Sequence, residues 1–294
     1  MNIMTNKRKY HLCYHIFAFV LIFALAISTN IPKERLSITV HASEKTFKFY
    51  DSYRKKWRKA KLDEDARKHN YNWSALKKTK KKIRYKDSNY NIRKGIDVSY
   101  YNGNIDWKKV KKSGIDFAFI RLGYRGYSNA SLNTDVKFKR NLKNAKKAGI
   151  DVGVYFFSQA INEKEAREEA AYILRVLGGK KLDMPIAYDS EEIVGLNARA
   201  NKISRKQNTK NAIAFCKRIE KTKYKAMIYT NLCREAYLFD MNKIDQYAIW
   251  YADYRKKPQT PYDFSIWQYT SHGKVAGIPG RVDLNIQFIP RKDD

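Results

Sequence analysis

The sequence contains few of the residues that build disulfide frameworks or metal sites. Its 294 residues include three cysteines and five histidines. Cys13 lies in an N-terminal apolar run, which leaves Cys216 and Cys233 in the body of the chain without a CxxC motif or a Cys/His spacing. This pattern excludes a small disulfide scaffold and gives no indication of a zinc site. We expect Cys216 and Cys233 to be free, buried thiols, and we expect no metal or other cofactor.

Acidic residues are also scarce compared with basic ones. The chain carries 60 lysines and arginines against 29 aspartates and glutamates, a formal net charge of +31. Such a balance predicts a polyanionic environment, either nucleic acid or a bacterial wall with phosphate polymers. Hydrophobic residues make up 44% and aromatic residues 14% of the chain, which excludes a disordered protein despite the charge.

The N-terminus distinguishes between these two environments. Basic residues at 7–9 precede the apolar run IFAFVLIFALAI at 16–27. A basic start followed by a short apolar stretch is typical of an export signal. We predict that residues 1–42 are a signal peptide or an N-terminal membrane anchor, so that the protein is exported and either held at the cell surface or secreted. A nucleic-acid partner is then not expected.

Residues 43–93 are strongly basic and include the stretches YRKKWRKAKL and LKKTKKKIRYK. Apolar residues interrupt the basic ones at Tyr53, Trp57, Leu62, Trp73, Leu76 and Ile83. We interpret this segment as a basic linker, in part helical, between the membrane and a folded domain. A sharper hypothesis is an electrostatic anchor that binds anionic lipid headgroups or wall polymers.

From residue 94 to residue 290, short strands alternate with helices. The predicted strands are 95–99, 117–124, 151–158, 185–191, 225–230, 247–254, 264–270 and 282–288. Predicted helices lie at 134–148, at 204–221 and after Asn162, a candidate N-cap with Glu165 three residues on, up to Gly178. Eight strands with helical crossovers predict an α/β fold, a small irregular (β/α)8 barrel like a TIM barrel with helices reduced in its second half. A doubly wound open sheet is the alternative, and 291–294 are expected to form a tail.

Three acids occupy four positions in the segment MPIAYDSEEI. Side chains alternate between the faces of a strand, so Asp189 and Glu191 share a face while Glu192 points the other way. Asp97 and Asp283 lie opposite apolar residues in the same manner. Since the outer face of a barrel meets helices, these acids should point inward, near the C-terminal strand ends where barrel enzymes place their chemistry. We predict that the four acids converge on one mouth.

Seven motifs carry a resemblance to a known family. They are GIDVSYYNGNIDW, FAFIRLGY, AGIDVGVYFFSQA, PIAYDSE, MIYTN, IWYADY and WQYTSHGKVAGIPGRVDLN. In this order they resemble the glycoside hydrolase family 25 lysozymes, the muramidases related to fungal, streptomycete and phage cell-wall lytic enzymes. Asn102 stands where this family often has glutamine, and Phe156 stands where histidine is frequent; both departures concern subsite preference and leave every carboxylate in place.

The resemblance implies a catalytic barrel at 94–290 that hydrolyses the β-1,4 bond between N-acetylmuramic acid and N-acetylglucosamine in peptidoglycan. Glycoside cleavage needs a proton donor at the leaving oxygen and negative charge near an oxocarbenium-like centre. Glu191 is the candidate general acid, because the nearby acids should raise its pKa. The resemblance implies that the substrate's 2-acetamido group attacks and that Asp189 orients it; an aspartate nucleophile or an activated water are alternatives. Asp97 and Asp283 would tune the charge and hold sugar hydroxyls.

Aromatic rings near the strand ends are candidate platforms for sugars. They are Tyr155, Trp250, Tyr251, Trp267 and Tyr269. We expect only one of the two tryptophans to face sugar, and we expect Arg121 either to pair with Asp97 or to bind substrate. The predicted partner is the peptidoglycan glycan strand, bound by a monomer. Two other functions stay open: an N-acetylglucosaminidase or chitinase-like enzyme, and a non-catalytic glycan-binding module, which would lack a catalytic carboxylate.

Overall fold

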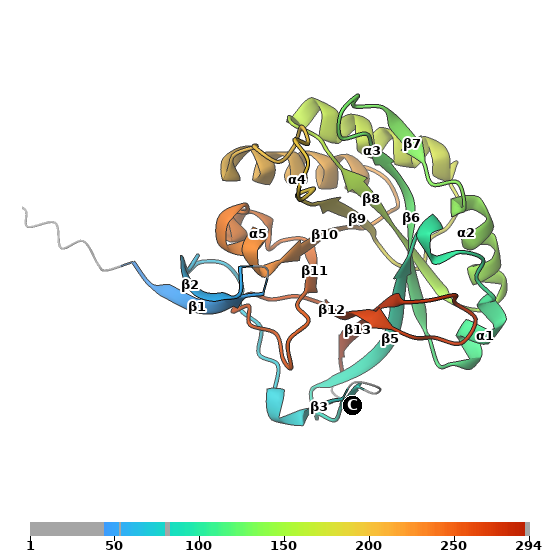
Figure 1. The fold of residues 1–294 in the computed structure, drawn as a ribbon, viewed down its shortest axis with the longest axis horizontal. Coiled ribbons are helices and arrows are strands. Elements are labelled where there is room, and N and C mark those ends of the chain that lie inside the picture. Colours follow the sequence, from blue (N-terminus) through green and yellow to red (C-terminus); the bar gives the residue numbers. More distant parts are fainter. Residues whose placement is uncertain (1–43, 53, 80–82, 292–294) are drawn as a thin grey trace, which may run out of the picture. The chain divides into compact units, whose positions relative to one another are not determined.

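Eight strands close into the barrel that the strand pattern predicts. The computed structural model describes residues 44–52, 54–79 and 83–291. Its main sheet has the order β5-β13-β12-β11-β10-β9-β8-β6, and β6 pairs back with β5 (Figure 1). The strands are β5 (Tyr90–Val98), β6 (Phe117–Arg125), β8 (Asp151–Ser158), β9 (Ile186–Ser190), β10 (Ala226–Asn231), β11 (Ala248–Ala252), β12 (Ile266–Gly273) and β13 (Val282–Pro290). The short strand β7 (Leu132–Thr134) pairs with β6. The barrel is therefore confirmed, and the open sheet is wrong.

The last strand runs against its neighbours. All the barrel pairings from β5 through β6, β8, β9, β10 and β11 to β12 are parallel, whereas β13 is antiparallel to both β12 and β5. Only residues 274–281 connect β12 to β13, too few for the crossover that parallel strands need. As a result, the beginning of β13 lies at the same end of the barrel as the C-terminal ends of the parallel strands.

Helices cover mainly the first half of the barrel. They are α1 (Trp107–Lys112), α2 (Phe138–Lys147), α3 (Glu163–Leu177), α4 (Arg205–Glu220), α5 (Leu232–Tyr237) and α6 (Met241–Ile244), with 3-10 turns η1 (Trp73–Ala75) and η2 (Tyr100–Asn102). Helix α3 has the expected ends: Glu165 N donates to Asn162 Oδ1 at 3.0 Å, and Gly178 ends the helix in a left-handed conformation with φ 55°. No helix follows β11 or β12, so the reduction of helices in the second half is confirmed. Both described cysteines are free; Cys216 is buried as expected, whereas Cys233 is only partly buried.

Large side chains fill the inside of the barrel. Phe117, Phe119 and Trp250 form a buried cluster there. Glycine on the neighbouring strand leaves space for these rings: a Cβ atom on Gly153 would lie 2.6 Å from the Phe119 ring and 2.8 Å from a backbone oxygen. The interior below the mouth is therefore solid, and any substrate must bind at the end of the barrel.

The described residues between 44 and 93 form mainly strands, so the interpretation of this segment as a partly helical linker is wrong for them. The segment forms the hairpin of β1 (Thr46–Asp51) and β2 (Lys56–Lys61) and the smaller hairpin of β3 (Leu76–Lys78) and β4 (Ile83–Tyr85). The only helical turn among its described residues is η1. The expected boundary at residue 93 falls inside β5.

This N-terminal segment covers the part of the barrel wall that has no helices. Tyr71 stacks on Phe288 of β13 with ring centroids 4.1 Å apart, and Trp73 packs against Phe264 and against Trp267 of β12. The apolar outer face of a barrel strand must be covered. The aromatic residues between the lysines provide this cover, while most of the lysines stay at the surface.

The predicted export signal lies outside the described residues, as does most of the expected tail at 291–294. Among the helices of the described part, none is both long and apolar enough to span a bilayer.

Candidate active site

The four predicted acids lie at one mouth of the barrel. Asp97 is near the C-terminal end of β5, Asp189 lies in β9 and Glu191 directly follows β9. Asp283 is directly paired with Asp97 across the β5–β13 ladder. The expectation that Asp283 sits near the C-terminal end of its strand is wrong, since it is the second residue of β13. The antiparallel direction of β13 nevertheless brings it to the same mouth.

Asp97 and Asp283 form the first carboxyl pair. Asp97 Oδ2 accepts hydrogen bonds from Asn285 Nδ2 at 2.8 Å and from Gln268 Nε2 at 2.9 Å. Burial and the charge of Asp283 raise the pKa of Asp97, although these two hydrogen bonds oppose the shift. Burial also raises the pKa of Asp283. Trp250 Nε1 donates to Asn285 Oδ1 at 2.8 Å, which fixes the amide that holds Asp97.

Asp189 and Glu191 form the second pair, and the two side chains interact closely enough that each affects the pKa of the other. Burial raises the pKa of Asp189, and the charges of Glu191 and Asp97 raise it further. Burial raises the pKa of Glu191 as well, and the charge of Asp283 adds to this effect. Two carboxyl groups in such contact titrate as a unit. The pair therefore retains a proton at pH values where separate, exposed carboxyl groups would have lost theirs.

Arg234, a residue that the sequence analysis did not identify, lies behind this second pair. Ser190 stands between the two acids in the chain, and its Oγ accepts a hydrogen bond from Arg234 Nη2 at 2.9 Å. The Arg234 side chain belongs to α5, is only 6% exposed, and its Nε has no hydrogen-bond partner in the described part of the chain. Its charge opposes the effect of burial on the pKa of Asp189 and Glu191. A lone arginine on a short helix offers no sequence signal for this role.

Three tyrosines surround the acids. Tyr229 and Tyr254 each donate their hydroxyl group to Gln268 Oε1, at 3.1 and 2.8 Å. Tyr155 packs edge-on against Trp250 with centroids 6.1 Å apart. Burial raises the pKa of all three tyrosines, and the negative charges of the acids raise it further. The sequence analysis predicted Tyr155 at the mouth but not Tyr229, Tyr254 or Gln268. The positions of these three residues depend on the register between strands that are distant in the sequence.

Three of the predicted sugar platforms do not face the mouth. Tyr251 and Trp267 belong to the core outside the barrel wall and are fully buried. Tyr269 lies against Trp267 on the same side, with Lys78 above both rings. Trp250 does point inward, but it is 2% exposed and lies beneath the acids rather than beside a sugar. Side chains alternate between the two faces of a strand, and this rule separates Trp250 from the three outward rings. We therefore correct the role of Tyr251, Trp267 and Tyr269 from sugar binding to packing.

Arg121 does not pair with Asp97, so the first of its two expected roles is wrong, and the substrate role stays a prediction. Its guanidinium lies 2.9 Å from Asp135 Oδ2. The same group lies over the rings of Tyr100 and Tyr101, 5.1 and 5.3 Å from their centroids. Tyr101 is 75% exposed. Arg121 therefore holds the rings of Tyr100 and Tyr101 on the β5 side of the mouth.

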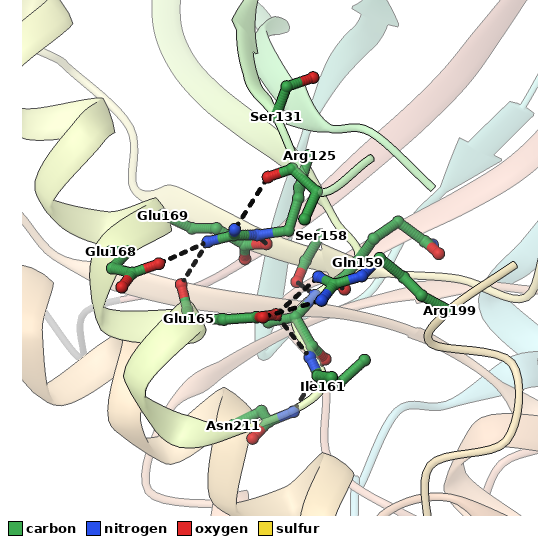
Figure 2. A network of polar contacts seen from close by, with 12 residues as sticks. Arg125, Ser131, Ser158, Gln159, Ile161, Glu165, Glu168, Glu169, Arg199 and Asn211 are labelled. Atoms are coloured by element: carbon green, nitrogen blue, oxygen red, sulfur yellow. Dashed lines mark hydrogen bonds and ion pairs between the residues drawn. The ribbon is translucent and has the colours of Figure 1, made fainter. Parts of the chain in front are cut away.

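A largely buried polar network joins the side chains of Arg125, Glu165 and Arg199 to Gln159 (Figure 2). Arg125 Nη2 donates to the carbonyl oxygen of Glu165, and Arg199 Nη1 lies 2.6 Å from the Glu165 carboxylate. Arg199 Nη1 also donates to the Gln159 carbonyl oxygen at 3.0 Å. Gln159 Nε2 in turn donates to the Glu191 carbonyl oxygen at 3.2 Å. The network links α3 and the end of β8 to the residue that follows β9.

Two surface cavities lie away from the four acids. One of about 310 Å³ is at the opposite end of the barrel, where β11 begins. The other, of about 270 Å³, lies beside the mouth and is lined by Tyr124, Tyr127, Phe157 and Ile193 among others. Within the described ranges, no group of three or more His, Cys, Asp or Glu side chains is arranged to hold a metal ion.

Comparison with known proteins identifies relatives over most of the barrel. Residues 96–278 match the family model described as Glycosyl hydrolases family 25. The chain is 30% identical to Uncharacterized protein YegX of Escherichia coli strain K12, over 65% of this chain and 68% of that protein. It is 27% identical to the Autolytic lysozyme of Clostridium acetobutylicum, over 65% of this chain and 55% of that one. It is also similar to the modular autolysin LytC from Streptococcus pneumoniae, solved with a synthetic peptidoglycan ligand (25% identity, TM-score 0.59, 71% and 54% of the two chains). The chain thus spans about half the length of the latter two.

Proposed function

The chain belongs to glycosyl hydrolase family 25, and on this basis we propose that it cleaves the β-1,4 bond between N-acetylmuramic acid and N-acetylglucosamine in peptidoglycan. The resemblance to the family 25 lysozymes is confirmed, and so is the enzyme class, a glycoside hydrolase of the lysozyme type. The observation that carries the proposal is the meeting of two carboxyl pairs, one from β5 and β13 and one from β9, at a single mouth.

We assign the general acid to Glu191. It donates its proton to the leaving glycosidic oxygen, while Asp189 orients and polarises the 2-acetamido group that attacks the anomeric carbon. Water then opens the resulting ring and returns a proton to Glu191. The strong mutual effect of the two carboxyl groups on their pKa values supports this route, because an inverting enzyme needs space for a water molecule between its carboxyl groups. The buried pair also keeps the required proton available near neutral pH.

The other site residues act on charge and position. Asn285 and Gln268 hold Asp97 in one orientation, so that Asp97 and Asp283 present negative charge to the developing oxocarbenium ion and bind sugar hydroxyls. Tyr155 is the sugar platform that we retain from the predicted aromatic set. A non-catalytic binding module would have no need for four acids in this arrangement.

We also propose that the protein acts outside the cytoplasm, at the cell surface or as a secreted enzyme, in wall remodelling or lysis. The basic and apolar pattern at 7–27 supports export. The net charge of +31 supports attraction to anionic wall polymers or lipid headgroups. Lys48 and Lys59 lie directly opposite each other in the β1–β2 hairpin. Like charges in this position repel each other, and a bound anion would relieve the repulsion. Binding to purified walls should therefore weaken as salt concentration rises.

Digestion of defined peptidoglycan tests the proposed bond. Mass spectrometry of the released reducing ends should show muramic acid, whereas glucosamine termini would indicate an N-acetylglucosaminidase instead. Glu191→Gln should lower the rate by roughly 10² or more and leave the fold intact. Glu192→Gln is the matched control, because Glu192 is the exposed neighbour of Glu191. Wild-type rates for Glu191→Gln would show that Glu191 is not the acid.

A further inference from the structure

The β1–β2 hairpin carries an exposed aromatic pair outside the family match. The hairpin spans 46–61, whereas the match begins at residue 96. The hairpin lies beside α5 (Figure 1). On its inner face Phe49 is buried, and Tyr237 of α5 lies beneath the guanidinium of Arg58. On the outer face, Tyr50 and Trp57 are cross-strand partners with ring centroids 5.7 Å apart. Trp57 is 65% exposed.

A cation from the barrel completes this surface. The guanidinium of Arg255 lies 4.7 Å from the centroid of the Tyr50 ring and 5.9 Å from that of Trp57. The hairpin is already attached through its inner face, so these outer contacts are not needed to hold it. We call Tyr50, Trp57 and Arg255 the aromatic rim.

The aromatic rim continues into the candidate active site. Arg255 directly follows Tyr254, which donates to Gln268 at 2.8 Å, and Gln268 donates to Asp97 at 2.9 Å. In the loop after β11, Tyr254 therefore reaches the hydrogen bonds around Asp97, and the next residue, Arg255, lies over the aromatic rings of the hairpin.

The loop is also held in place from the N-terminal segment. Tyr50 N donates to Gln259 Oε1 at 2.8 Å, and Lys78 Nζ donates to the Arg255 carbonyl oxygen at 2.6 Å. Two separate hairpins thus fix one short stretch of the mouth. A surface fixed in this way needs little ordering when a ligand binds.

We propose that the aromatic rim binds the glycan strand of peptidoglycan beyond the sugars held at the four acids. The proposal rests on the proposed function, because it takes the ligand of the mouth to be a glycan. Pyranose rings have apolar faces that stack on aromatic rings, and the exposed side chain of Trp57 presents such a ring. Arg255 donates hydrogen bonds to sugar hydroxyls from its stacked position. An anionic wall polymer would instead select exposed lysines and would not require an indole.

Kinetics on substrates of two lengths test this site. Trp57→Ala should raise KM for long, peptide-free glycan strands roughly 3- to 10-fold. This factor corresponds to the loss of about one aromatic contact with the sugar. The value of kcat and the kinetics on a short soluble oligosaccharide should not change, whereas Trp57→Phe should restore most of the affinity. Lys56→Ala, at an exposed neighbouring position, is the control. Equal KM values for Trp57→Ala and wild type on long strands would overturn the proposal, as would an equal loss on both substrates.

Binding without cleavage separates this proposal from the proposed function. In the Glu191→Gln background, adding Trp57→Ala should weaken sedimentation with long glycan strands by the same factor. If the wild-type protein releases no reducing ends, the proposed function fails while this binding comparison still decides the role of the rim. If Trp57→Ala weakens binding only to walls that retain phosphate polymers, the occupant is the anionic polymer and the proposal is wrong. Unchanged thermal unfolding of the variant would exclude a folding defect.

Discussion

Replacement of Glu235 by glutamine is expected to stabilise the protein at neutral pH. Glu235 lies on α5 and is 1% exposed. Burial raises its pKa to about 8, and the nearby charge of Asp253 contributes in the same direction. Asp253 is itself hydrogen-bonded to Tyr251 and to the backbone of Arg255 and Gln259. The site therefore favours the neutral form of Glu235.

The size of the effect follows from proton linkage. Below pH about 4.5, Glu235 is protonated in both the folded and the unfolded chain, so it contributes no pH dependence. As the pH rises towards about 8, Glu235 ionises in the unfolded chain but keeps its proton in the folded chain. The free energy of unfolding therefore falls by about 1.4 kcal/mol per pH unit. At pH 7 the loss amounts to about 3 kcal/mol. Glutamine does not ionise, so Glu235→Gln should recover a gain of this order.

Denaturant unfolding at two pH values is the measurement. The unfolding midpoint of Glu235→Gln should exceed that of the wild type at pH 7 and should match it near pH 4, with the same denaturant slope. Glu220→Gln is the control, because Glu220 is exposed at the end of α4. A gain that persists at pH 4, or no gain at pH 7, would refute the reasoning from burial and charge.

Further predictions concern the site and the barrel interior. Arg234→Gln removes the positive charge behind Asp189 and Glu191, so the alkaline limb of the kcat/KM profile should move to higher pH, whereas Arg234→Lys should move it less; an unchanged profile would limit Arg234 to packing. Asn285→Ala leaves Asp97 with one donor fewer and should lower kcat/KM roughly tenfold in assays on purified walls; an undiminished rate would mean that Gln268 suffices. Gly153→Val places methyl groups against the Phe119 ring and should destabilise the fold by about 1–3 kcal/mol in thermal unfolding, and a neutral effect would contradict the close packing inside the barrel.

The candidate site could be predicted to a large extent because it depends on strand alternation. Asp189 and Glu191 lie two positions apart, which places them on one face whatever the rest of the fold does. The same rule, applied to Trp250 and Tyr251, would have separated the inward ring from the outward one. Tyr229 and Gln268 depend on register between strands distant in sequence, and no local pattern specifies that register.

The sequence by itself determined the eight strands of the barrel, the inward direction of the acids and the family, because each of these follows from local periodicity or from ordered motifs. The tertiary structure alone decided the direction of β13, which brings Asp283 to Asp97 from the beginning of its strand. It also decided the role of residues 44–93. Their lysines suggested a solvated linker, but the strands without helices expose an apolar outer face, and the aromatic residues Tyr71 and Trp73 bury it. Burial on folding depends on what the rest of the chain leaves uncovered, and composition does not reveal that.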